Sequence, residues 1–177
     1  MTLQQHHEAM IALAKKKLYR NQKLDCLCIM SDADNNQYCL PYGSFEDRST
    51  FLANAALMIQ YGGMLFYSIL AEAWMATDIP EEQIDTVKIA ELPNRIEVLI
   101  IVTASKTEKL FASFEMLRDE QERFIGLKKH DKFKPEGGAM ATLFEKDLSD
   151  KDIARFKSKW ESELRPILAL LTKDYLS

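Results

Sequence analysis

Three charged side chains near the middle of the chain have the residue types needed for acid–base chemistry. Glu72 lies inside MLFYSILAEAWMAT (64–77), where every other residue is apolar, small or hydroxyl-bearing. Arg95 and Glu97 open the run RIEVLIIVTA (95–104). A carboxylate in a core needs a partner, because an unpaired buried charge is costly. Two carboxylates beside one guanidinium form either a structural ion-pair network or an acid–base site with perturbed pKa values.

Neighbouring strands are predicted to position these charges. As a strand, 64–77 has apolar residues on both faces, which is typical of a central strand covered on both sides. Its Ala, Met and Leu content also suits a helix, but the aromatic residues and the preceding Gly-Gly favour a strand. The β-branched run 95–104 is the clearest strand in the chain. Antiparallel pairing of the two would bring Glu72 toward Arg95, its expected partner, and would place Trp74 on the same face as Glu72.

This region resembles small uncharacterised proteins found in phages and bacterial prophages. The resemblance covers roughly residues 60–130 and rests on EAW (72–74), followed by a polar loop and the pattern P-x-R-x-E at Pro93, Arg95 and Glu97. It implies a viral context and brings no assigned activity, substrate or catalytic residue. The first positions to test are therefore Glu72, Trp74, Arg95 and Glu97.

A basic stretch, LKKHDKFK, follows further along the chain. It combines lysines with one aromatic residue: Lys128, Lys129, Lys132, Lys134 and Phe133. Lysines and a stacking side chain suit an anion or a nucleic-acid backbone. Lysine-rich strand ends are, however, also typical of solvated sheet edges that resist aggregation. Because the net charge is −4, nucleic acid is the less favoured partner.

Other catalytic and metal-binding signatures are missing or incomplete. No phosphate-binding loop, dinucleotide fingerprint or nucleophile elbow is present. Asp32, Asp34 and Asn36 have the D-x-D-x-N spacing of a calcium loop, but Gln37 and Gly43 stand where that loop needs Gly and Glu. A hairpin turn explains the same residues without an ion. We therefore expect neither a metal nor a cofactor.

The cysteines are expected to be reduced, packed thiols. Cys26 and Cys28 are two apart in a predicted strand and would share a face, while Cys39 lies on the next strand. Their odd number gives no disulfide framework, and they lack a natural fourth ligand for zinc. Free cysteine in a core behaves as a small apolar residue.

The whole pattern predicts a single α+β domain over residues 1–177. An antiparallel β-meander of about five or six strands is packed by N-terminal, middle and C-terminal helices. The helices are expected over 2–20, 45–63 and 148–176, and Pro166 should kink the last one or split it in two. No membrane span and no signal peptide are predicted, so the cytoplasm is the expected location.

These observations favour a non-enzymatic binding or accessory protein, phage-related and self-associating as a homodimer or larger assembly, with an unidentified protein or ligand as its other partner. Self-association is inferred from an apolar surplus in the C-terminal helix, at Phe156, Trp160 and 164–171. The rival hypotheses are an enzyme and a nucleic-acid binder. The enzyme would use Glu72, Glu97 or Glu115 with Arg95, and Trp74 with Lys128, Lys129 and Lys132 are the candidate ligand-binding residues.

Overall fold

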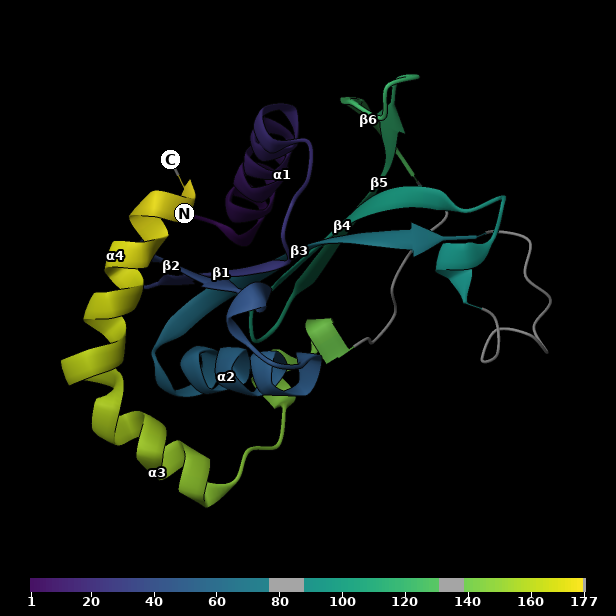
Figure 1. Ribbon diagram of the computed structural model, residues 1–177. Coiled ribbons are helices and arrows are strands. Elements are labelled where there is room, and N and C mark those ends of the chain that lie inside the picture. Colours follow the sequence, from purple (N-terminus) through teal and green to yellow (C-terminus); the bar gives the residue numbers. More distant parts are fainter. Residues whose placement is uncertain (77–87, 131–138, 177) are drawn as a thin grey trace.

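The computed structural model describes residues 1–76, 88–130 and 139–176. It confirms the predicted α+β class: one six-stranded antiparallel sheet carries helices on both faces (Figure 1). The strands are β1 (Leu27–Asp32), β2 (Gln37–Pro41), β3 (Met64–Met75), β4 (Ile96–Ala104), β5 (Lys109–Arg118) and β6 (Phe124–Lys129). The helices are α1 (Leu3–Asn21), α2 (Arg48–Tyr61), α3 (Asp150–Lys159) and α4 (Arg165–Leu176), with a π-helical turn (Trp160–Leu164) between the last two.

The strand order is β2-β1-β3-β4-β5-β6, so β3 to β6 form a meander in chain order. The β1–β2 hairpin joins this meander through β1, and α2 connects the edge strand β2 to the central strand β3. The composition of the segment predicted over 64–77 suited either a strand or a helix, and the structure shows strand β3 there. In its register with β4, Glu72 lies opposite Leu99 and Trp74 lies opposite Glu97.

Two hydrophobic cores lie on opposite faces of the sheet. Helix α1 packs Met10, Ala14 and Leu18 against one face, while α2 and α3 pack against the other. The cysteines are divided between these cores: Cys28 faces α2, and Cys39, opposite Ile29 in the register, lies in the core beneath α1. All three cysteines are free thiols, and burial raises the pKa of Cys26 to about 11 and that of Cys39 to about 12.

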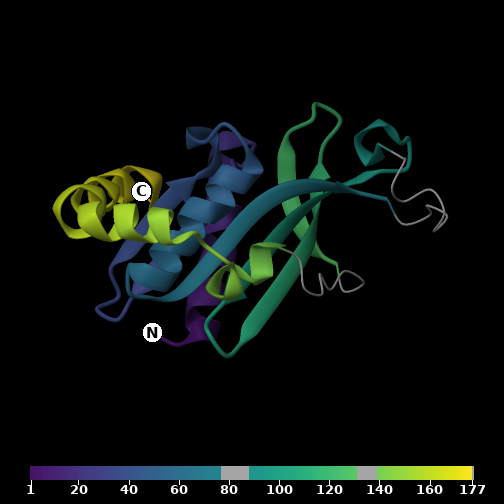
Figure 2. The same cartoon turned by 90° about the horizontal axis from the view of Figure 1, so that it is seen from below.

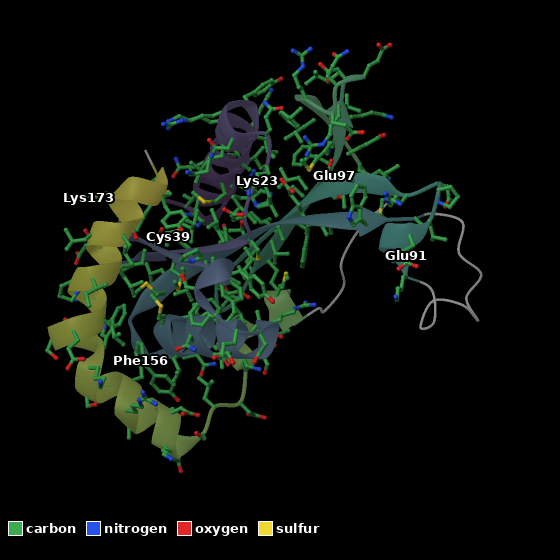
Figure 3. All side chains as sticks on the ribbon, viewed as in Figure 1. Lys23, Cys39, Glu91, Glu97, Phe156 and Lys173 are labelled. Atoms are coloured by element: carbon green, nitrogen blue, oxygen red, sulfur yellow. The ribbon has the colours of Figure 1, made fainter. Side chains whose placement is uncertain are left out.

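Helix α4 covers the β2 edge of the sheet. The Thr172 hydroxyl accepts a 2.7 Å hydrogen bond from the backbone N–H of Cys39 and donates one of 2.7 Å to the Leu168 carbonyl. Cys39 lies beside α4 in Figure 3. Pro41, on the same strand, lacks a backbone N–H and so exposes no unpaired donor at this edge. This cover blunts an edge that would otherwise pair with other strands.

The predicted kink near Pro166 is the π-helical turn between α3 and α4. A proline ring lacks an N–H and clashes with the preceding turn of a regular helix, so a wider turn accommodates it. The turn begins at Trp160, whose ring packs over Gly62 at the end of α2 and stacks on Phe156 with centroids 5.1 Å apart.

Gly62 is the position where this packing leaves no room for a side chain. An added Cβ would lie 2.5 Å from the Met58 carbonyl oxygen and 3.0 Å from the Trp160 ring. Because overpacking of this kind costs roughly 1–3 kcal/mol, we expect Gly62→Ala to lower the free energy of unfolding by about 2 kcal/mol in urea titrations. Gly43→Ala is the control, since an added Cβ there meets nothing within 4 Å. Equal stability of the two variants would contradict the prediction.

Candidate functional site

The predicted charged residues do lie together at one end of the sheet. Glu72 and Trp74 are two residues apart on β3 and therefore point to the same face of the sheet. Glu97 lies opposite Trp74 on β4, so these three side chains share the face that carries α1. Arg95 directly precedes β4, and its guanidinium lies 4.7 Å from the centre of the Trp74 ring. The alternation of side chains along the two strands therefore correctly predicted that these residues lie near one another.

The pairing within this group differs from the prediction. Glu72 accepts a hydrogen bond from the backbone N–H of Leu24, which ties the segment after α1 to β3. Arg95 stacks on Trp74 and donates to the Leu92 carbonyl at 3.2 Å. The expected Glu72–Arg95 pair is therefore wrong, because each side chain finds a nearer partner.

The partner of Glu97 is Arg118 of β5, which the sequence reasoning did not consider. Two hydrogen bonds of 2.6 and 3.0 Å join the guanidinium to the carboxylate, and both side chains are largely buried. Arg118 also donates to the backbone carbonyls of Gln22 and Glu122. One arginine thus holds together the end of α1, strand β4 and the β5–β6 turn.

The electrostatics of this cluster follow from its burial. Desolvation raises the pKa of Glu72, and the charge of Glu97 adds to this effect, while the Leu24 N–H and Arg118 oppose it. The hydrogen bonds with Glu97 raise the pKa of Arg118. The Arg118 guanidinium makes a bidentate pair with Glu97 and bonds further backbone carbonyls, while the Glu72 carboxylate bonds a backbone N–H. Contacts of this kind hold neighbouring segments together, so they fit the interpretation of this cluster as a structural ion-pair network.

The basic stretch is only partly described. Lys128 lies opposite Glu115 in the β5–β6 register and pairs with it at 3.1 Å. Lys129 ends β6 and is exposed. The remaining candidate, Lys132, lies outside the described residues, as do Phe133 and Lys134. Because Glu115 offsets the charge of Lys128, this pair contributes little net attraction for a nucleic-acid backbone.

A polar network that the sequence reasoning missed joins the β1–β2 hairpin to the C-terminal helices. Asp32 is 7% exposed and accepts hydrogen bonds from the backbone N–H groups of Asp34 and Asn36, from the Asn36 amide and from the Tyr38 hydroxyl. Arg165 donates to Asp32 at 3.3 Å and to the Tyr38 hydroxyl at 2.9 Å. The hairpin interpretation of the D-x-D-x-N spacing agrees with these contacts, since Asp32 closes the turn.

The described part of the chain contains no group of three or more His, Cys, Asp or Glu side chains placed to hold a metal ion. Nor does any helix in that part have both the length and the apolar character needed to cross a bilayer.

An exposed apolar surface remains on α4. Ile167, Leu170 and Leu171 keep 54%, 67% and 43% of their surfaces exposed, and we call these three residues the α4 stripe. The sequence placed them in the apolar surplus together with Phe156 and Trp160. Those two are 6% and 4% exposed and belong to the core, so the surplus is confined to α4.

The chain matches no protein-family model, no curated protein and no solved structure. The resemblance to phage and prophage proteins therefore stays a prediction.

Proposed function

We propose that the protein is a non-enzymatic binding protein that self-associates through the α4 stripe. The supporting observation is that three large apolar side chains remain exposed on one side of α4, while its other side is packed on β2 through Thr172 and Leu168. Their spacing of three and four residues makes one continuous ridge on a helix. An exposed apolar ridge of this kind is typical of a protein contact.

A cytoplasmic location and a phage or prophage origin complete the proposal. The three free thiols support a reducing compartment. The viral origin is supported by the resemblance of the EAW and P-x-R-x-E motifs alone.

The proposal predicts that Leu170→Glu strongly weakens self-association. Leu170 is the most exposed residue of the stripe, and a carboxylate there would have to be buried without a partner in the assembly. Because the stripe is small compared with a standard interface, we expect the wild-type protein to associate with a micromolar dissociation constant. Sedimentation equilibrium over a range of protein concentrations measures it, and the variant should be at least tenfold weaker.

Ala169→Glu is the matched control. Ala169 is exposed on the same helix outside the stripe, so the variant makes the same change in charge and should associate like the wild type. A wild-type chain that stays monomeric at several hundred micromolar, or an equal loss in both variants, would refute the proposal.

A further inference from the structure

Helix α4 is attached to the rest of the molecule by few contacts. Among its described side chains only Thr172 is buried, whereas α2 buries seven of its side chains. Leu168, Tyr175 and Leu176 pack against the two cores but are only partly buried. Figures 1 and 2 show α4 on the β2 side of the sheet, across the molecule from β6. An element that buries so little apolar surface opens more readily than the core helices do.

The contacts that α4 does make are specific to the edge of the sheet. The Thr172 hydroxyl accepts a hydrogen bond from the backbone N–H of Cys39 on the edge strand β2. Arg165 donates to the Tyr38 hydroxyl at 2.9 Å and to the Asp32 carboxylate at 3.3 Å. Because Cys39 is fully buried, leaving its N–H without an acceptor would be costly. This edge therefore needs an α4 helix in place, and the helix of a second copy offers the same groups.

The segment between α3 and α4 has the properties of a hinge. It is the π-helical turn Trp160–Leu164, in which the N–H of Arg165 donates to the Trp160 carbonyl five residues earlier. Such turns are rare and occur mostly where function requires an irregular helix. Figure 1 shows that the chain changes direction at this turn. Short connections under strain favour the exchange of the element that follows them between two copies of a protein.

We infer that two copies exchange their α4 helices, so that each α4 packs on the β2 edge of the other copy. The inference rests on the proposed self-association, and it identifies the surface that receives α4. The fit of the two surfaces is the one that the structure shows within a single copy, with the same hydrogen bonds from Thr172 and Arg165.

The proposed contact between two α4 stripes leads to this exchange. Copies that meet through their stripes hold both α4 helices side by side, where each helix lies close to the other copy. After the exchange, the chain no longer has to turn back at Trp160–Leu164, so this segment can relax to a regular helix. Each copy gives one helix and receives one, so the assembly closes as a two-fold dimer.

Changes to the hinge test the inference. Deleting Ser162 removes the extra residue of the π-helical turn, and Pro166→Ala in the same chain lets α3 continue into α4 as one helix. In this variant α4 is directed away from its own β2 edge. We therefore expect it to be dimeric in sedimentation equilibrium at concentrations where the wild type is a mixture of monomer and dimer.

A longer hinge should have the opposite effect. A Gly-Ser-Gly-Ser insert after Leu164 lets α4 fold back on its own copy without a strained turn, so association should be at least tenfold weaker than in the wild type. The same insert after Asp147, which is exposed in the loop before α3, is the matched control. It leaves the hinge unchanged and should associate like the wild type.

The rate of dissociation separates an exchanged dimer from a simple contact. With a micromolar dissociation constant and an ordinary association rate, two folded surfaces separate within about ten seconds. An exchanged dimer must first release α4 from β2, so a wild-type dimer isolated by gel filtration should dissociate at least a hundredfold more slowly after dilution. Thr172→Val removes the hydroxyl that holds the Cys39 N–H and should make this dissociation faster.

Two results would refute the exchange while self-association through the α4 stripe stands. One is a wild-type dimer that dissociates within seconds, and the other is a hinge insert that leaves association unchanged. If circular dichroism shows that the variant without Ser162 is unfolded, the insert and the dissociation rate decide the question by themselves. A wild-type protein that stays monomeric would overturn both the exchange and the proposed function.

Discussion

Replacing Asp32 with alanine is expected to lower the free energy of unfolding by about 3 kcal/mol, because a hydrogen bond to a charged group contributes about 1.5–3 kcal/mol and this carboxylate accepts several. The carboxylate is 7% exposed and accepts hydrogen bonds from four residues: Asp34, Asn36, Tyr38 and Arg165. Removing it leaves buried donors without an acceptor, and an unsatisfied buried donor costs about 1–3 kcal/mol.

The effect should reach beyond the hairpin, because Arg165 is the first residue of α4. Its guanidinium holds both Asp32 and the Tyr38 hydroxyl, so the loss of Asp32 also weakens the attachment of α4 to the sheet. Urea titration followed by circular dichroism gives the free energy of unfolding. Limited proteolysis of α4 should become faster in the same variant.

Asp34→Ala and Asp32→Asn separate the causes of this loss. Asp34 lies in the same turn but is exposed, so its replacement should change stability by less than about 0.5 kcal/mol. Asp32→Asn keeps the size of the side chain and removes its charge, and should fall between the two alanine variants. If Asp32→Ala is as stable as Asp34→Ala, Asp32 does not anchor the C-terminal helices.

The strands were predictable because their signals are local. The aromatic residues and Gly-Gly around 64–77 identified β3 correctly, and alternation then placed Glu72 and Trp74 on one face. The β-branched run that became β4 needed no tertiary information. The prediction of an exposed apolar surface on the C-terminal helix also came from local spacing.

The partners of the charged residues were not predictable in the same way. Arg118 reaches Glu97 from the neighbouring strand β5, beyond Val98 and Glu115, the last residue pair of the β4–β5 register, and no local sequence pattern predicts that contact. Arg165 and Asp32 are 133 residues apart in the chain. Trp160 and Phe156 were assigned to the surplus because helical periodicity shows which residues are apolar but not which neighbour covers them.

A pair of adjacent histidines in the first turns of α1 should make the protein sensitive to mild acid. His6 is fully buried, and its Nδ1 lies 3.3 Å from the Ser31 hydroxyl. His7 Nδ1 lies 2.8 Å from the Thr103 hydroxyl, which in turn lies 2.7 Å from that of Ser68. Desolvation by burial, assisted by the neighbouring His7, lowers the pKa of His6 to about 4. Burial also lowers the pKa of His7.

The direction of the pH effect follows from these pKa values. The folded protein keeps His6 neutral down to about pH 4, whereas the unfolded chain protonates it near pH 6.5. Its contribution to stability is therefore complete above pH 6.5 and is lost progressively as the pH falls toward 4. For a pKa difference of this size, His6 alone should remove about 2 kcal/mol of the free energy of unfolding between pH 7 and pH 5.

The measurement compares the wild type with His6→Gln, which cannot titrate in this range but can still hydrogen-bond Ser31. Urea titrations at pH 7 and pH 5 give the change for each protein, and the carboxylates contribute equally to both. The wild type should lose about 2 kcal/mol more than the variant over this interval. His6→Gln costs some stability at both pH values through altered packing, so only the difference between the two pH values is diagnostic. If both proteins lose the same free energy of unfolding between pH 7 and pH 5, His6 is protonated in the folded protein at pH 5. Its burial would then not limit the stability of the protein in acid.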